Sequence, residues 1–284
     1  MVKLIYDSAS YQQPLFQEPV MSQFSTFHQL HAATTPLLLP NAWDAASALL
    51  FQQEGASAMA TSSAALAWSL GYADGGALPR HELLAAVGRL LRVLRVPLTV
   101  DIENGYSDSP AEVAQLVVEL ANLGVAGINL EDGGNTPALM SEKIRTVRSA
   151  LAGRALFINA RTDVWLRNLA QGDGAVDMAI ERLLSYQAAG ADGAFVPGAT
   201  SVADVRRLVL ALNMPLNVMT RPNMPAIADL FAAGARRFSA GSALYENCCE
   251  HGRDLVAGFL HEQNVTDMFA KGVAYGQMNA LFQR

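Results

Sequence analysis

Two acidic residues end a short apolar run of the sequence, Asp101 and Glu103 in Leu98–Glu103. In a β-strand, residues two apart point to the same face, so this spacing predicts that the two carboxylates project together, with Val100 and Ile102 on the opposite face. Two carboxylates on one face repel each other unless a positive charge lies between them. The pair therefore predicts a site for a divalent cation.

Eight apolar runs of this kind alternate with segments of helical periodicity from about residue 22 onward. The runs are Leu37–Trp43, Ala58–Ser63, Leu98–Glu103, Gly127–Asp132, Leu156–Arg161, Gly193–Gly198, Leu216–Thr220 and Arg236–Gly241. The predicted helices include Arg80–Leu94, Pro110–Leu123, Ser141–Leu151, Ala175–Ala189, Ser201–Leu212 and Met224–Ala233. Eight such units in 284 residues predict an α/β fold, a (β/α)8 TIM-type barrel of parallel strands. A doubly wound open sheet is the alternative, but the first turn, Pro40–Asp44, has no GxGxxG sequence.

The composition narrows the classes of partner. A net charge of −6 without a cluster of Lys or Arg argues against nucleic acid. No run approaches the ~20 apolar residues that a membrane span requires, so no membrane partner is expected. The only two cysteines, Cys248 and Cys249, are adjacent and cannot form a disulfide framework, which favours a cytoplasmic location.

The chain divides into two expected parts. Residues 1–21 form an N-terminal extension without the apolar region of a signal peptide, and either Met1 or Met21 could be the start. Residues 22–284 form the barrel, followed by a C-terminal helical region that is longer than an eighth barrel helix requires.

Polar residues gather at the predicted strand ends, where the active sites of barrel enzymes lie. Asn129 alternates with Glu131, and Asn159 with Arg161, in the same way as the first acidic pair, which aims these side chains into the barrel mouth. Three or four carboxylates around a single arginine make the pocket too acidic to hold only anions. A bound cation corrects this balance, and Mg²⁺ suits all-oxygen ligands while keeping several waters.

The order of these motifs resembles the isocitrate lyase/phosphoenolpyruvate mutase superfamily, from about Phe24 to beyond Gly241. The segments that carry the resemblance are Leu38–Asp44, Thr61–Ser63, Ser69–Asp74, Val100–Tyr106, Gly127–Asp132, Asn159–Asp163, Phe195–Pro197 and Asn217–Met219. Each is weak alone, but together they are specific in this order and at these strand ends. The resemblance implies a homodimer or homotetramer in which the C-terminal helices are exchanged between subunits.

The resemblance also implies a metal site. Asp101 would bind Mg²⁺ directly, with Mn²⁺ as a possible substitute, and Glu103, Asp74 and Glu131 would hold the waters of the metal. The metal would polarise the oxygen on which negative charge develops during the reaction.

The substrate, by the same resemblance, is a small 2-oxo or 2-hydroxy (di)carboxylic acid that reacts through a pyruvate-like enolate. Ser62 and the backbone N–H groups around Ser63 and Ala64 would bind its carboxylate, with Asn217 bordering the same pocket. Arg161 would stabilise the oxyanion on the neighbouring carbon. The predicted catalytic residues are Arg161, Ser62 and Glu131.

The loop after the fourth predicted strand departs from the lyases of the superfamily. Isocitrate and methylisocitrate lyases carry Lys-Lys-Cys-Gly-His there, with the Cys as the catalytic acid, whereas Gly133–Met140 contains no Cys, Lys or His. Asn135 is the only counterpart to the Lys and Asn of mutases and phosphonopyruvate hydrolases. Pro197 replaces a His or Glu of some members, and Ala60 replaces an aromatic residue. An isocitrate or methylisocitrate lyase is therefore not expected.

A missing acid is compatible with decarboxylation, because a leaving CO₂ needs no proton. The predicted function is a Mg²⁺-dependent carbon–carbon lyase or decarboxylase. The alternatives are P–C bond chemistry of the phosphonopyruvate hydrolase or mutase type, and a non-catalytic sensor that keeps the pocket for a 2-oxo acid. A phosphate-binding barrel enzyme, suggested by Ala240–Ser242, lacks the second glycine-rich turn that it would require.

Overall fold

Nine short strands form one parallel sheet in the computed structural model, which describes residues 22–199 and 201–283. The strands are β1 (Leu37–Leu39), β2 (Asn41–Ala42), β3 (Met59–Thr61), β4 (Leu98–Asp101), β5 (Gly127–Glu131), β6 (Phe157–Arg161), β7 (Gly193–Phe195), β8 (Leu216–Met219) and β9 (Arg237–Ser239). β1 and β2 are halves of the first predicted strand, separated at Pro40, which has no N–H for a ladder hydrogen bond.

The sheet closes because β1 pairs with β9 while β2 pairs with β3. All eight predicted strands are therefore present, and the predicted (β/α)8 barrel is confirmed. The predicted N-terminal extension, 1–21, and both candidate start residues lie outside the described residues.

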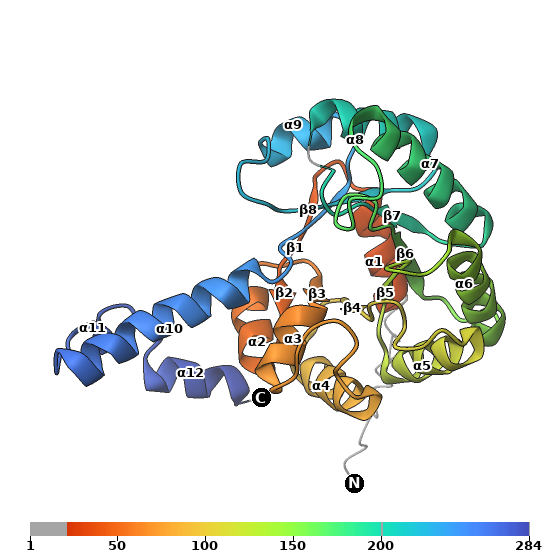
Figure 1. Cartoon of the computed structure of the whole chain (residues 1–284). Coiled ribbons are helices and arrows are strands. Elements are labelled where there is room, and N and C mark those ends of the chain that lie inside the picture. The colour runs from red at the N-terminus through yellow and green to blue at the C-terminus, as the bar shows by residue number, and fades with distance from the viewer. Residues whose placement is uncertain (1–21, 200, 284) are drawn as a thin grey trace, which may run out of the picture.

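Helices follow the strands and surround the barrel (Figure 1). They are α2 (Ala45–Gln53), α3 (Ser63–Ser69), α4 (Arg80–Val93), α5 (Pro110–Leu123), α6 (Pro137–Leu151), α7 (Gly172–Ala188), α8 (Val202–Ala211) and α9 (Ile227–Ala232). The six predicted helices are confirmed, α5 with the predicted bounds and the other five with shifted ends. α6 begins four residues earlier than predicted because Thr136 accepts a capping hydrogen bond from Leu139 N–H and Pro137 occupies the first turn.

A further helix, α1 (Gln23–His31), closes the N-terminal end of the barrel and was not predicted (Figure 1). Phe27 of α1 packs inside the barrel against the first residues of the strands, including Leu37 and Phe157. There is no room for another side chain: a Cβ on Gly127 would lie 2.9 Å from the Phe27 ring. The other apolar core lies between the strands and the outer helices.

The C-terminal region leaves the barrel as an arm (Figure 1). It consists of α10 (Ala243–His261), α11 (Asp267–Ala270) and α12 (Tyr275–Phe282), none of which buries a residue. Tyr245, in the first turn of α10, packs edge-on against Trp43. No helix among the described residues is long and apolar enough to cross a membrane.

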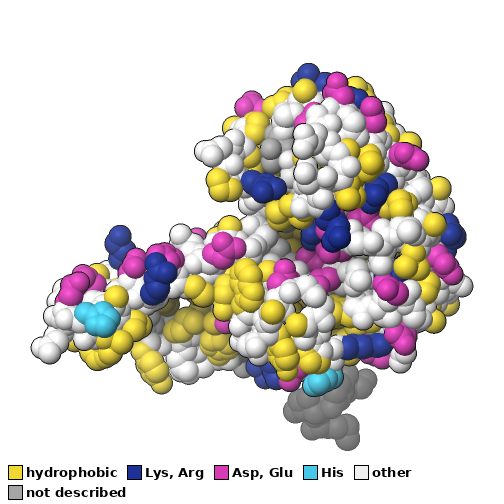
Figure 2. Space-filling model, viewed as in Figure 1, with side chains coloured by type: hydrophobic (Ala, Val, Ile, Leu, Met, Phe, Trp, Pro, Cys, Tyr) yellow, Lys and Arg dark blue, Asp and Glu magenta, His cyan; other side chains and the backbone are white. Residues whose placement is uncertain are grey.

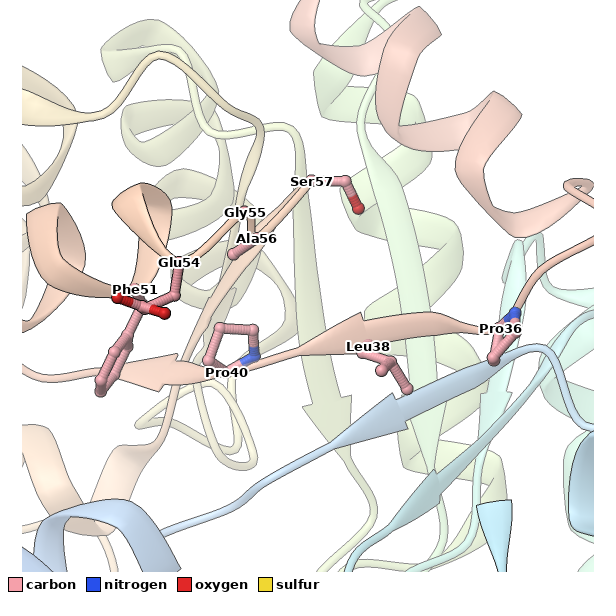
Figure 3. Close-up of a pocket in the computed structure, with 8 residues that line it drawn as sticks. All are labelled: Pro36, Leu38, Pro40, Phe51, Glu54, Gly55, Ala56 and Ser57. Atoms are coloured by element: carbon pink, nitrogen blue, oxygen red, sulfur yellow. The ribbon is translucent and has the colours of Figure 1, made fainter. Parts of the chain in front are cut away.

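The outward face of β1 consequently has no helix over it. Leu37 and Leu39 point into the barrel, whereas Leu38 points outward and is 49% exposed. A groove of about 400 Å³ lies there, beside the end of α2 (Figure 3). We call it the β1 groove, and it is lined by Pro36, Leu38, Pro40, Phe51, Glu54, Gly55, Ala56 and Ser57.

Candidate active site

A cavity of about 140 Å³, the inner cavity, opens at the C-terminal ends of the strands. It contains six of the predicted site residues: Ser62, Ser63, Ala64, Asp74, Asp101 and Arg161. The other lining residues are Asn41, Asn129, Phe195, Met219, Ser239, Gly241 and Ser242. Residues far apart in the sequence thus meet where barrel enzymes bind substrates.

A second cavity of about 380 Å³, the outer cavity, contains the two remaining predicted carboxylates, Glu103 and Glu131. Its other lining residues are Gly75, Gly76, Asn104, Tyr106, Ser107, Asp108, Gly133, Gly134 and Arg167. The two cavities adjoin, because Glu131 of the outer cavity pairs at 2.7 Å with Arg161 of the inner one. Figure 2 shows basic and acidic side chains together in the hollow at the centre of the barrel.

The strand-alternation argument for Glu103 is wrong, although the two acidic residues do lie close together. β4 ends at Asp101, and Glu103 has a left-handed backbone with φ of 50°. The chain turns here, with Glu103 N–H donating to Asp101 Oδ1 (3.1 Å) and Gly105 N–H to the carbonyl of Ile102 (2.8 Å). As a result Asp101 lines the inner cavity and Glu103 the outer one.

Asp101 and Glu103 are buried carboxylates, and no ion pair engages either of them among the described residues. Burial raises the pKa of Asp101, against the opposing effect of Arg161. Burial, followed by repulsion from Asp74 and Asp101, raises the pKa of Glu103 to about 7. Glu103 Oε1 is buried and has no hydrogen-bond partner among the described residues. These are the properties expected of carboxylates that await a cation.

An all-oxygen donor set of this kind fits Mg²⁺. Among residues 22–199 and 201–283, no three His, Cys, Asp or Glu side chains gather closely enough to hold a metal ion by themselves. Mg²⁺ commonly binds through one or two carboxylates and keeps several waters, so Asp101 as a single direct ligand is compatible with this arrangement.

Arg161 is held by two carboxylates. The register of the sheet places it beside Glu131 on the neighbouring strand, where its Nη1 makes the 2.7 Å ion pair. Its Nε and Nη2 donate to the two oxygens of Asp163, at 2.6 and 3.0 Å. Each Nη keeps one N–H for a ligand. Glu131, Asp163 and Asp101 raise the pKa of Arg161, although its burial acts in the opposite direction.

The sequence assigns no role to Asp132, but in the structure Asp132 supports Arg161 indirectly, through Asp163. Its buried carboxylate accepts hydrogen bonds from Thr162 Oγ1 (2.7 Å), Asp163 N–H (3.0 Å), Arg182 Nη1 (2.8 Å) and Tyr186 Oη (2.7 Å). The carboxylate therefore fixes the turn that presents Asp163 to the arginine. Its position directly after a strand was visible in the sequence, but the four donors come from distant segments.

A second arginine lies below the inner cavity, so the prediction of a single arginine among the carboxylates is wrong. Arg237 of β9 is 1% exposed, and its Nη2 donates to Asn129 Oδ1 (2.9 Å). Its Nε and Nη1 have no partner among the described residues. Burial lowers the pKa of Arg237 to about 9, against the attraction of Asp101. The only sequence signal was a charged residue inside an apolar run.

The structure does not bring the remaining polar candidates into the cavities. Asn217 is fully buried, donates to Ser239 Oγ (3.2 Å) and lines neither cavity. Asn135 binds Asp108 and Lys143. Cys248 and Cys249 are exposed on α10. A replacement for the missing lyase acid is therefore not found at Asn135, Cys248 or Cys249.

Comparisons with known proteins agree with the fold and the motifs. A family model described as phosphoenolpyruvate phosphomutase matches residues 27–260. An uncharacterized protein of Mycobacterium tuberculosis is 39% identical over 225 residues, which are 78% of this chain and 83% of that protein. The oxaloacetate decarboxylase of Pseudomonas aeruginosa is 33% identical over 178 residues, which are 58% of this chain and 59% of that enzyme.

A solved structure is also similar. The crystal structure of a putative phosphonomutase from Burkholderia cenocepacia J2315 superposes with a TM-score of 0.78 and 36% identity, covering 82% of this chain and 97% of that one. The predicted superfamily is thereby confirmed. The chain belongs to the phosphoenolpyruvate phosphomutase family, within the PEP mutase/isocitrate lyase superfamily.

Proposed function

We propose that the protein is a Mg²⁺-dependent carbon–carbon lyase acting on a small 2-oxo or 2-hydroxy (di)carboxylic acid, with decarboxylation of an oxaloacetate-like acid as its reaction. The observation that carries this proposal is the inner cavity, which gathers Ser62, Asp101 and Arg161 at one end of the barrel. The similarity to an oxaloacetate decarboxylase supports it and gives the substrate to test first.

Ser62 and the residues after it bind the carboxylate that stays on the product. The Ser62 side chain accepts a hydrogen bond from Ala65 N–H and begins α3, so Ser63 and Ala64 have backbone N–H groups that no helical carbonyl accepts. All three residues line the inner cavity. Their hydroxyl and N–H groups would donate to the carboxylate next to the 2-oxo group.

Asp101 would hold the metal, and Glu103, Asp74 and Glu131 would orient its waters. Mg²⁺, when bound there, would act as a Lewis acid on the 2-oxo oxygen and the adjacent carboxylate. It would also neutralise the mutual repulsion that raises the pKa of Glu103.

Arg161 stabilises the charge that the reaction creates. When the bond between the methylene carbon and the leaving carboxylate breaks, CO₂ departs and the electron pair forms the enolate, which places negative charge on the 2-oxo oxygen. The free N–H groups of Arg161 would donate to that oxygen. Phe195 and Met219 make part of the lining apolar, which limits water around the enolate until a solvent proton converts it to the keto acid.

Turnover of oxaloacetate tests this proposal. We expect purified protein with Mg²⁺ to release pyruvate faster than Mg²⁺ alone, chelation to abolish the difference, and Arg161→Lys, which loses the planar fork, to reduce kcat about a hundredfold. The exposed Arg145 provides the control, because Arg145→Lys should leave the rate unchanged.

Phosphonopyruvate belongs in the same assay, since the similar structure from Burkholderia is a putative phosphonomutase. Release of phosphate would favour P–C chemistry over decarboxylation. Binding of these acids without turnover would favour a sensor. Pyruvate release no faster than the metal blank would contradict the proposed reaction.

A further inference from the structure

Side-chain hydrogen bonds join the two loops that line the outer cavity. Lys143 of α6 is fully buried, and its Nζ donates to the Asn104 carbonyl (2.8 Å) and to Asn135 Oδ1 (2.9 Å). Asn135 Nδ2 in turn donates to Asp108 Oδ1 (2.9 Å). The loop after β4 and the loop after β5 are thus held together by one ammonium group. The cavity between them is a preformed space rather than a gap between loose loops.

Most charges in these walls are already compensated. Glu131 pairs with Arg161, and Asp108 is bound by Asn135 with the Lys143 ammonium 3.9 Å away. Glu103 faces the proposed metal.

Arg167 is the exception, and it is the one basic side chain among the described residues that line the outer cavity. No hydrogen bond or ion pair engages its guanidinium within the described part of the chain. A positive group without a protein partner therefore faces a cavity that adjoins the reaction site.

The backbone and the guanidinium of Arg167 each have a neighbour near the site. Arg167 N–H donates to the carbonyl of Asp163 (2.9 Å), the residue whose carboxylate clamps Arg161. The Arg167 guanidinium lies over Gly134, since a Cβ built there would be 3.4 Å from its Nη2. Asp163 therefore anchors the backbone that carries Arg167, and the lack of a side chain at Gly134 leaves the space beside the Arg167 guanidinium open.

We propose that Arg167 binds the second carboxylate of a short dicarboxylic substrate, the one remote from the 2-oxo or 2-hydroxy group, while the other end of the substrate occupies the inner cavity. Arg167 is exposed, but a guanidinium matches a carboxylate in a bidentate geometry, and a charge-assisted hydrogen bond of this kind is stronger than one between neutral groups. This inference rests on the proposed function, because it takes the 2-oxo or 2-hydroxy group and the carboxylate next to it to lie beside Ser62 and Asp101. It makes Arg167 the residue that selects diacids over monoacids.

A matched pair of ligands isolates the second carboxylate. Malate and 2-hydroxybutyrate differ at one end, where the second compound has a methyl group, and oxalate fills the inner cavity alone. We would measure the affinity of each by calorimetry in the presence of Mg²⁺. Arg167→Gln should weaken malate about tenfold and leave oxalate and 2-hydroxybutyrate unchanged, and Arg167→Lys, which keeps the charge, should fall between.

Two further arginines serve as controls. Arg145 is exposed on α6, so Arg145→Gln should change no affinity. Arg221 lies beside Gly198, with its Nη1 3.4 Å from a Cβ built there, and it lines neither cavity. Arg221→Gln should leave the affinity for malate unchanged.

The outcomes separate this inference from the proposed function. Malate binding that is insensitive to Arg167→Gln, while oxalate still binds, would overturn the role of Arg167 alone. A loss of malate affinity in Arg221→Gln instead would overturn it by placing the second carboxylate elsewhere. Failure of oxalate to bind the unmodified protein with Mg²⁺ would overturn the proposed function and this inference together.

Discussion

Two arginines lie inside the barrel in different surroundings, the partly buried Arg161 and the fully buried Arg237. Arg161 has two carboxylate partners, whereas Arg237 has one amide oxygen and the face of the Phe27 ring at 5.7 Å. A buried charge without a close counter-ion is costly, which agrees with the lowered pKa of Arg237. Asp101 is the carboxylate that stabilises it, so the predicted metal ligand also helps to retain a cation in the floor of the site.

His31 is affected by the same buried charge, and this leads to a prediction about stability. Its side chain is buried against Phe157, and burial followed by Arg237 and the neighbouring His28 lowers its pKa to about 3, although the Phe27 carbonyl opposes the shift. The unfolded chain takes up this proton near pH 6.5 and the folded chain does not. The contribution of His31 to stability is thus complete above pH 6.5 and is lost as the pH falls toward 3.

Replacing His31 should flatten this dependence. Between pH 7.5 and 5, His31 accounts for a loss of about 2 kcal/mol in the free energy of unfolding. We expect His31→Leu to lose correspondingly less than the unmodified protein over this interval, measured by urea unfolding at both pH values. The exposed His81 is the control, and His81→Leu should keep the original slope. An unchanged slope in His31→Leu would contradict the assignment.

The sequence identified much of the candidate site at the residue scale, because strand ends in a parallel barrel converge. Asp101, Arg161 and Ser62 follow or end strands and share a cavity. Glu103 was misplaced because a left-handed backbone at a non-glycine residue is uncommon and leaves no pattern. Arg237 was missed because a three-residue strand is too short to show which of its side chains point inward.

At the scale of elements, close packing between α1 and the strands decides which residues can begin a strand. A Cβ on Gly127 of β5 would lie 2.9 Å from the Phe27 ring and 3.0 Å from the Phe157 carbonyl oxygen. Gly193 of β7 is crowded in the same way, 2.7 Å from the Phe157 ring. These glycines make room for the rings of Phe27 and Phe157, which fill the N-terminal end of the barrel.

A substitution at Gly127 tests this packing. We expect Gly127→Ala to lower the free energy of unfolding by about 1–3 kcal/mol, since the added methyl group overpacks this region and forces the Phe27 ring to shift. Gly88 in α4 has nothing within 4 Å of a built Cβ, so Gly88→Ala should raise stability by about 0.5–1 kcal/mol. Chemical denaturation of both variants provides the measurement. A neutral Gly127→Ala would show that α1 does not fill the barrel as described.

The predicted elements follow from hydrophobic periodicity, and the unpredicted ones are those where periodicity is weak. α5 matches its predicted range of Pro110–Leu123 in full, because a long amphipathic pattern ends at Gly124, which has a left-handed backbone. α3 has only seven residues, too few to establish a helical period. α1 is stabilised by packing against the barrel end that it covers, and the sequence pattern does not show this contact.

At the scale of the whole molecule, two unpartnered surfaces belong together. The arm formed by α10 to α12 exposes apolar side chains, among them Leu260 (63%) and Phe269 (81%), while the β1 groove exposes Leu38. In a (β/α)8 barrel the helix after the last strand covers the first strand, and here α10 does not. We propose that α10 of a second copy of this chain occupies the β1 groove, as the predicted helix exchange requires.

Such an exchange predicts an oligomer, and substitutions on either of the two surfaces should disrupt it. Light scattering after gel filtration should give a mass at least twice the 30.3 kDa of the chain. Leu38→Glu and Leu260→Glu should each shift the protein toward the monomer, because a charge would be buried in the contact. Asp254→Asn, on the same helix, should leave the mass unchanged. A monomeric unmodified protein would contradict the exchange.

The central claim is that the inner cavity holds a metal and an enolate between Asp101 and Arg161. A crystal structure with Mg²⁺ and oxalate, which mimics the enolate, tests it most directly. We expect the metal at about 2.1 Å from an Asp101 oxygen, with its waters bound by Glu103, Asp74 and Glu131. Oxalate should contact Ser62 and Arg161. A metal bound away from Asp101, or oxalate outside the inner cavity, would contradict the account.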